Sequence, residues 1–260
     1  MEEKICGIEG GNMIVYGPVA SWRLGRSLGI DLINSAKTCS FDCIYCQLGR
    51  TVHLTAERKK FVEDEHIMKE IDSLPPLEAD VVTFSGTGEP TLAENLGMAA
   101  EYVKKLNLPT AILTNSSLFW REDVRKDLKK IDWIIAKLDA PDEKIFRKIN
   151  RPHKSIDFDE MIEGMKKVAR NAKKFSLQMM FVKENVFHAR EMAELAKEIK
   201  AHEIQLNTPL RKSPVKPLSE EDMEKIAEYF EGMNVKEVYS SSPPEAKPID
   251  YMEVLRRRPE

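Results

Sequence analysis

Six short apolar runs, rich in β-branched residues, alternate with amphipathic stretches along most of the chain. The runs cover residues 29–34, 80–86, 109–117, 133–140, 175–182 and 203–209, and the amphipathic stretches cover 62–73, 92–106, 156–173, 187–200 and 219–232. Strands that are apolar throughout and alternate with helices usually pair in parallel, with helices covering both faces of the sheet. The pattern therefore predicts an α/β fold, a partial (β/α)6 TIM-like barrel.

Proline-rich connectors indicate how the chain is organised around this barrel. A chain of 260 residues is long enough for one large core. We expect an N-terminal extension over residues 1–28, a barrel core over 29–209 and a C-terminal extension over 210–260 that packs on the barrel. The stretches 210–218 and 240–248 are rich in proline and indicate connectors rather than helices.

Polar residues stand at the ends of the expected strands. Right-handed crossovers place the carboxyl end of every parallel strand on one rim, where α/β barrels carry their active sites. The residues at these ends are Gly86, Thr87, Gly88 and Glu89 after the second strand, Asn115 on the third, Lys137 and Asp139 on the fourth, Gln178 on the fifth and Asn207 on the sixth. We expect them to converge on one mouth.

Charge and hydropathy narrow the classes of partner. The net charge of −3 and the isoelectric point near 6.1 give no overall positive field that would attract nucleic acid. No stretch approaches the roughly 18 consecutive apolar residues that a membrane helix requires. The start MEEKICGIEGG lacks a signal-peptide pattern. We therefore expect a cytoplasmic protein with no membrane partner.

Three of the four cysteines fall in the stretch KTCSFDCIYCQLGR. Residues this close make a poor disulfide framework, so Cys39, Cys43 and Cys46 are interpreted as metal ligands or reactive thiols. With His53 they would form a Cys3His zinc site, whereas a catalytic thiol pair would leave the third cysteine without a role. A third interpretation is a [4Fe–4S] cluster on three thiolates, with one iron open to an outside ligand. The rim position favours the open cluster, because a closed zinc site there would only fix a turn.

The CxxxCxxC spacing, with Tyr45 directly before the third cysteine, resembles the cluster motif of the radical S-adenosylmethionine (SAM) superfamily. SGTGEPTL at residues 85–92 resembles the family's Gly-Gly-Glu-Pro element, and the resemblance continues in barrel order over residues 29–209. It implies a barrel of the radical SAM type and two cofactors, a [4Fe–4S] cluster on the three cysteines and SAM. It also implies reductive cleavage of SAM to a 5′-deoxyadenosyl radical, which removes hydrogen from an unassigned substrate.

The resemblance further implies which residues hold SAM. Backbone groups of Gly86, Thr87, Gly88 and Glu89 would hold its amino group. Lys137 and Asp139 match side chains near the end of the fourth strand that contact the ribose and the methionine carboxylate, and Gln178 matches their counterpart on the fifth strand.

Four further residues complete the expected site. Asn207 ends the strand whose backbone supports the adenine, Tyr45 lies on the nearby cluster loop, and Asn115 is an additional candidate. Lys137 is a candidate for a catalytic role as well. Cys6 is interpreted either as a buried apolar side chain or as a catalytic thiol.

Stretches outside the shared motifs bear on the substrate. Residues 17–32, 148–154 and 207–218 resemble radical SAM proteins related to the wyosine-synthesising tRNA enzyme. The basic residues in these stretches would surround the mouth and could hold an anionic substrate; they are Arg23, Arg26, Arg151, His153, Arg211 and Lys212. That tRNA enzyme carries further N-terminal cysteines for a second cluster, whereas this chain has only Cys6 upstream, so a second cluster is not expected.

Several functions and partners stay open on these grounds. An external electron donor such as ferredoxin or flavodoxin is implied, and the substrate is an unknown small molecule, RNA or protein. The alternatives are a tRNA-modifying enzyme like the wyosine synthase, an activase of a glycyl-radical enzyme, and a noncatalytic zinc-binding barrel.

Overall fold

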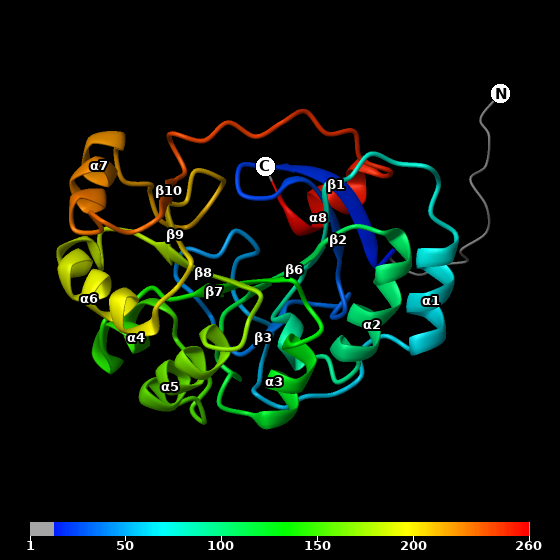
Figure 1. The fold of residues 1–260 in the computed structure, drawn as a ribbon, viewed down its shortest axis with the longest axis horizontal. Helices are drawn as coiled ribbons and strands as arrows, with labels where there is room; N and C mark the ends of the chain where they lie inside the picture. The colour runs from blue at the N-terminus through cyan, green and yellow to red at the C-terminus, as the bar shows by residue number, and fades with distance from the viewer. Residues whose placement is uncertain (1–12, 260) are drawn as a thin grey trace.

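The computed structural model describes residues 13–259, whose centre is one curled sheet of eight strands (Figure 1). In spatial order the strands are β1 (Val15–Ser21), β2 (Gly25–Ile30), β5 (Val81–Phe84), β6 (Thr110–Thr114), β7 (Trp133–Lys137), β8 (Lys174–Met180), β9 (Glu203–Asn207) and β10 (Val235–Glu237). Strand β1 is antiparallel to β2, and all the other neighbours are parallel. The sheet forms a half-barrel, which confirms the expected α/β fold class.

The sheet has two more strands than the six that the apolar runs predict. Strand β1 precedes the first expected strand, and its pairing with β2 shifts register between Tyr16 and Val19, around Gly17 and Pro18. Such a Gly-Pro pair interrupts an apolar run and marks a bulge rather than a strand interior. Strand β10 has only three residues, too few for any periodicity to show. Strand β2 (Gly25–Ile30) also spans residue 28, where the N-terminal extension was expected to end and the barrel core to begin. The division of the chain into three segments therefore stays a prediction.

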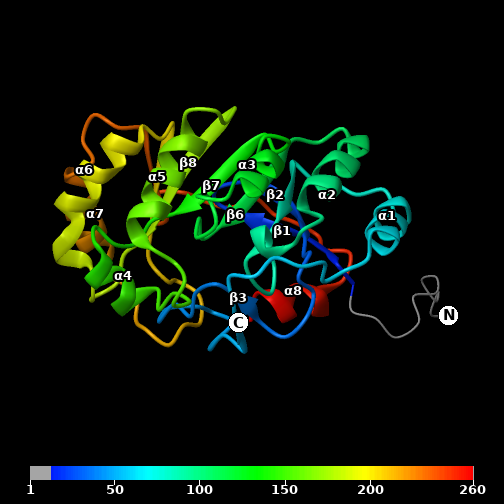
Figure 2. The same ribbon diagram turned by 90° about the horizontal axis from the view of Figure 1, so that it is seen from below.

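Within the described residues, seven α-helices surround the outer face of the half-barrel, and an eighth lies against β1 (Figures 1 and 2). They are α1 (Asp64–Asp72), α2 (Leu96–Tyr102), α3 (Glu122–Leu128), α4 (Glu143–Ile149), α5 (Phe158–Ala169), α6 (Ala189–Ile199), α7 (Glu220–Glu228) and α8 (Tyr251–Arg257), with 3-10 turns η1 (Pro90–Leu92), η2 (Val103–Leu106) and η3 (Val186–His188). The helical pattern predicts all of the α-helices except α3, α4 and α8. Each of these three has seven residues, about two turns, which is too short for an amphipathic period to stand out; α2 is as short, but its apolar period continues into η2.

Helix α5 shows how the sequence sets the outer layer. The side chain of Asp157 accepts a hydrogen bond from the backbone N–H of Glu160, which caps the start of the helix. Its apolar residues recur at helical spacing, and Met161, Met165 and Val168 are buried against the sheet. Each fully buried apolar side chain of this kind contributes about 1.5–3 kcal/mol.

A small parallel ribbon lies at the rim of the half-barrel. It pairs β3 (Thr38–Cys39) with β4 (His53–Leu54). Thr38 also forms a bridge to Gly88, in the loop that follows β5. The first cysteine therefore stands beside the Gly-rich loop.

The chain after β10 returns across the open side of the half-barrel to the opposite edge (Figure 1). There the backbone N–H of Ile249 donates to the carbonyl of Gly17 in β1, 2.6 Å away, and α8 packs on β1. No helix among residues 13–259 is long and apolar enough to span a bilayer.

Candidate cluster and cofactor site

The three clustered cysteines lie on one short loop at the rim. Cys39 ends β3, and Cys43 and Cys46 close a turn in which the N–H of Cys46 donates to the carbonyl of Cys43 at 3.1 Å. The loop is anchored to the end of α4, because the N–H of Ile44 donates to the carbonyl of Ile149. All three thiols are half-buried, and none is in a disulfide.

Amide N–H groups point at two of these sulfurs. The side-chain amide of Asn115 lies 3.5 Å from Sγ of Cys39, and the backbone N–H of Phe41 lies at the same distance. The amide of Asn150 lies 3.4 Å from Sγ of Cys43. Donors of this kind stabilise metal-bound thiolates and tune the potential of an iron–sulfur cluster.

The surroundings do not favour free thiolates. Burial raises the pKa of the Cys39 thiol well above its ordinary value. Burial also raises the pKa of Cys43 to about 11, although the ammonium of Lys137 acts in the opposite direction. A metal centre supplies the positive charge that deprotonated sulfur needs in such a place. The donor set thus fits an iron–sulfur cluster.

The position of His53 argues against the Cys3His zinc interpretation. In the register of the β3–β4 ribbon, His53 is paired with Thr38, and Cys39 is paired with Leu54. Successive side chains of a strand point to opposite faces, so His53 lies on the face away from Cys39. Among residues 13–259, no group of three His, Cys, Asp or Glu side chains is arranged to hold a single metal ion. A cluster does not require this, because it takes each cysteine on a different iron.

Asp139 is the centre of a buried hydrogen-bond network beside the cysteine loop. Its Oδ2 accepts from the hydroxyl of Tyr45 and, at 2.8 Å, from the amide of Asn150. Its Oδ1 accepts from the backbone N–H of Met180 at 2.8 Å. The residue is 2% exposed, and three donors therefore hold the carboxylate in one orientation.

Lys137 joins the same group from the end of β7. Its Nζ lies 5.0 Å from the centre of the Tyr45 ring and 3.4 Å from Oε1 of Gln178 on β8. Asn207 ends β9, and its carbonyl accepts from the N–H of Phe181 at 2.7 Å. The structure thus brings Lys137 of β7 and Gln178 of β8 together with Tyr45 of the cysteine loop.

Glu89 of the Gly-rich loop uses its whole carboxylate within the protein. Its Oε1 accepts from the N–H and the hydroxyl of Thr91 and from the hydroxyl of Thr114, and its Oε2 accepts from the N–H of Asn115 at 2.7 Å. Burial raises the pKa of Glu89, and these hydrogen bonds oppose the shift. The carboxylate fixes η1 against the end of β6.

The two glycines of this loop allow protein groups to approach closely. A Cβ at Gly88 would lie 1.7 Å from the carbonyl oxygen of Thr38, and one at Gly86 would lie 2.1 Å from Cγ of Asp31. Gly86 also has a φ of 155°. Glycine at both positions therefore lets the loop pack on β3 and on the residue that follows β2.

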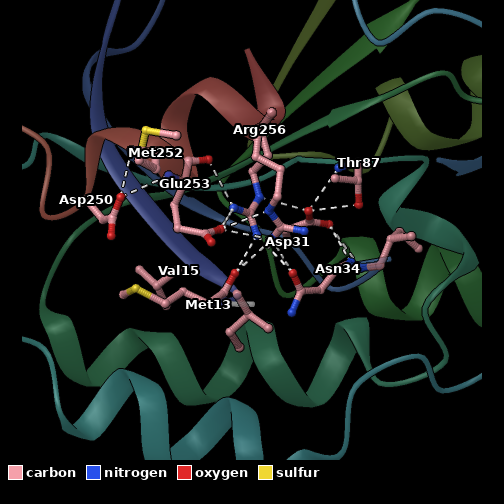
Figure 3. A network of polar contacts seen from close by, with 12 residues as sticks. Met13, Val15, Asp31, Asn34, Thr87, Asp250, Met252, Glu253 and Arg256 are labelled. Carbon is pink, nitrogen blue, oxygen red and sulfur yellow. Dashed lines mark hydrogen bonds and ion pairs between the residues drawn. The ribbon is translucent and has the colours of Figure 1, made fainter. Parts of the chain in front are cut away.

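Asp31 is a site residue that the sequence motifs do not reveal. Its Oδ2 accepts from the N–H and hydroxyl of Thr87, at 3.0 and 2.9 Å, and from Nε of Arg257 in α8 at 2.9 Å. Figure 3 shows this network, in which Arg256 and Glu253 of α8 face Asp31 and Asn34. Asn150 and Arg257 escape sequence reasoning in the same way, since only the fold places them beside the cysteine and glycine loops.

The structure corrects one expected position among the basic residues. Arg26 lies at the start of β2, and its guanidinium pairs with Asp80, directly before β5. Because β2 and β5 begin together at this end, the pair stands opposite the rim and not at the mouth. The sequence does not indicate this position, because the apolar runs do not show the hairpin of β1 and β2 that places Arg26 at the start of a strand.

Three other basic residues that are expected at the mouth have different surroundings. Arg151 and His153 flank the cysteine loop through backbone bonds, since the carbonyl of Arg151 accepts from Asp42 and the N–H of His153 donates to Ser40. Lys212 is exposed. Cys6 lies outside the described residues.

Comparison with known proteins identifies the family. The Radical SAM superfamily model matches residues 33–196. A UPF0026 protein of Methanocaldococcus jannaschii is 41% identical over 84% of this chain and 71% of its own, and one of Synechocystis sp. is 42% identical over 77% of each.

Among solved structures, Streptococcus suis SuiB bound to S-adenosylmethionine has a similar fold. Its TM-score is 0.58 at 18% identity, covering 78% of this chain and 48% of SuiB. This chain thus spans about half of the SuiB length. The expected radical SAM resemblance is confirmed: the chain belongs to the radical SAM superfamily of enzymes and to the UPF0026 family.

Proposed function

We propose that the chain binds one [4Fe–4S] cluster through Cys39, Cys43 and Cys46, and that SAM bound to it is reductively cleaved to a 5′-deoxyadenosyl radical that removes hydrogen from a substrate. The observation that carries the proposal is the set of three free thiols on one rim loop, two of them facing amide N–H donors. The superfamily match supports the same two cofactors.

The side chains around this loop have separate tasks. Lys137 is a point charge suited to neutralising the methionine carboxylate of SAM. Asp139 already accepts three hydrogen bonds, which leaves about one of roughly four acceptor positions for a ribose hydroxyl. The carboxylate of Glu89 accepts four hydrogen bonds within the protein, and backbone groups of residues 86–89 are therefore the better partners for the amino group of SAM.

The remaining expected residues support the loop or the ligand. Asn115 donates to Oγ of Ser40 at 2.8 Å as well as facing Cys39, so it orients the cluster loop. Gln178 orients the ammonium of Lys137. Asn207 contributes backbone beside the adenine position. An electron donor such as ferredoxin or flavodoxin, in a reducing and anaerobic cytoplasm, completes the proposal.

Anaerobic reconstitution with iron and sulfide tests this function. The wild-type chain should take up about four irons and release 5′-deoxyadenosine from SAM when it is reduced. Cys43→Ala should lose both properties. His53→Ala is the matched control, because His53 is exposed on the opposite face of the ribbon, and it should keep both.

The zinc alternative gives a different pattern. It predicts about one zinc and no iron per chain, with metal lost in His53→Ala as well as in Cys43→Ala. That result, or 5′-deoxyadenosine release by Cys43→Ala, would refute the proposed function.

A further inference from the structure

An open groove lies between α3 and α5 on the outer face of the half-barrel. The two helices follow each other around the sheet (Figures 1 and 2), and the α3–α5 groove has a volume of about 260 Å³. Its floor is apolar and comes from three elements. The floor residues are Leu128 of α3, Ile134 of β7, Val168 of α5 and Ala172 just after α5.

A close contact at one end of the helix pair explains where the groove begins. A Cβ at Gly164 of α5 would lie 2.6 Å from the carbonyl carbon of Phe119 and 2.7 Å from the backbone N of Trp120. Glycine therefore lets α5 touch the loop before α3 at this point. One turn further along α5, Val168 borders open space instead. Ile134 is the second residue of β7, so the groove lies toward the end of the sheet that is opposite the cysteine loop.

Positive charge is concentrated along the borders of the groove. Four cations line it with a single acid, Glu122, which pairs with Lys126 at 2.9 Å. Lys129 and Lys167 line the groove from opposite helices, and neither has an ion pair within residues 13–259. The guanidinium of Arg125 donates only to backbone carbonyls of the preceding loop, which do not neutralise its charge. The whole chain has a net charge of −3, so this border is a local exception.

An exposed aromatic side chain stands beside the closed end. Trp120 is 42% exposed, and its carbonyl accepts from Arg125 of the groove. The guanidinium of Arg121 lies 5.8 Å from the centre of the Trp120 ring. Exposed tryptophan and arginine side chains are enriched where proteins bind one another. The volume of the groove is also below the roughly 300–1,000 Å³ of a typical small-molecule site, so a side chain of a partner protein fits it better.

We infer that the α3–α5 groove docks a partner protein through a short acidic segment. An apolar side chain of that segment enters the groove, and its carboxylates meet Lys129 and Lys167 on the two sides. Complementary charge of this kind selects the partner and speeds its association. The inference goes beyond the proposed function, because the groove lies away from the cysteine loop and requires neither iron nor SAM.

Fluorescence anisotropy of the full chain tests the inference, with a labelled peptide of two leucines flanked on each side by two glutamates as the probe. The peptide should bind saturably, and its affinity should fall as salt is raised. An analogue with glutamine for glutamate and one with alanine for leucine should each bind about fivefold more weakly or worse.

Charge reversal on both sides of the groove tests the role of the lysines. The double variant Lys129→Glu/Lys167→Glu should weaken peptide binding about tenfold or more. Lys144→Glu/Lys197→Glu is the matched control, because it makes the same change in charge at exposed positions on α4 and α6. This control should keep the wild-type affinity.

A variant that fills the groove separates docking from a loss of folding. Ala172→Leu should unfold at the wild-type temperature or slightly above it, because the added carbons occupy open space on the apolar floor. It should nevertheless weaken peptide binding about fivefold or more. Thermal unfolding and anisotropy measure the two effects.

Four results would overturn the inference. They are no binding of the glutamate–leucine peptide, equal binding of its glutamine analogue, unchanged affinity in Lys129→Glu/Lys167→Glu, and binding of octanoate as tight as that of the peptide. The last would assign the groove to a small amphiphilic anion. Failure of the proposed function looks different, because a chain without iron would still bind the peptide.

Discussion

Nε of Arg257 donates to Oδ2 of Asp31 across 2.9 Å, and both side chains are almost completely buried. The same oxygen accepts from Thr87, so one carboxylate joins α8 to the loop after β5. The carbonyl of Arg257 also accepts from the amide of Gln47, the residue after Cys46. Helix α8 therefore holds both loops that are expected to bind cofactors.

Arg257→Met should destabilise the chain by about 3–5 kcal/mol, because it leaves the buried Asp31 carboxylate without its cation. Urea unfolding at neutral pH measures the change. Arg170→Met, at the exposed end of α5, removes the same charge from the surface and should cost less than about 0.5 kcal/mol. Equal costs for the two variants would contradict the role of the ion pair.

Gly88→Ala should cost about 3 kcal/mol or more and lower iron uptake, because its Cβ would meet the carbonyl oxygen of Thr38, next to Cys39. Urea unfolding and iron content after reconstitution measure the two effects. Gly49→Ala is the comparison, since its φ is 72° but no atom lies within 4 Å of the added Cβ. Gly49→Ala should cost only the strain of placing an alanine in a left-handed backbone conformation, about 1–2 kcal/mol. Full iron uptake by Gly88→Ala would argue against the prediction.

Asn150→Leu should make the cluster harder to reduce. It removes the amide donor to Sγ of Cys43, and N–H donors to sulfur stabilise the more negative reduced cluster. It also takes one donor from Asp139, at a cost of about 1–3 kcal/mol. Redox titration followed by electron paramagnetic resonance should show a more negative potential. Asn171→Leu, at an exposed site, is the control and should leave the reduction potential unchanged. An unchanged potential in Asn150→Leu would show that the amide of Asn150 does not tune the cluster.

Asp123→Asn should reveal a pH-dependent contribution to stability. Hydrogen bonds from Arg121 and then Arg58 hold the pKa of Asp123 well below its ordinary value of 3.8. A lowered carboxylate pKa stabilises the fold above the unfolded value and loses this effect as the pH falls. The deficit of the variant at neutral pH should be below about 1 kcal/mol, because the carboxylate is half exposed.

Urea unfolding at several pH values should show this deficit shrinking below about pH 4. Glu231→Gln, at an exposed position, is the control, and its free energy of unfolding should differ from that of the wild type by the same small amount at every pH. A deficit that stayed constant or grew on acidification would contradict the assigned sign.

The parts of the fold that could be predicted from sequence are those with a strong local signal. The parallel strands β5 to β9 are apolar runs, and the three cysteines and SGTGEPTL are local motifs. Strand β1 could not be predicted, because Gly17 and Pro18 hide its pattern and its antiparallel pairing depends on a register shift. Without β1 the start of β2 cannot be recognised either, so the sequence wrongly predicts Arg26 at the mouth.

The residues that sequence reasoning missed act through long-range contacts. Asp31 and Arg257 are 226 positions apart, and Asn150 and Cys43 are 107 apart. No local spacing signals such pairs. Their side chains are common charged or amide types, so only the folded sheet shows that they meet beside the cofactor loops.

The return of the chain from β10 to β1 has a consequence for biosynthesis. Asp31 is translated 226 positions before the arginine that neutralises it, so a growing polypeptide carries this carboxylate without its partner for most of its elongation. The cysteine loop is translated early as well, whereas its contact through Gln47 waits for α8. A nascent chain that has not yet reached α8 therefore lacks the contacts through which this helix holds the cysteine loop and the Gly-rich loop.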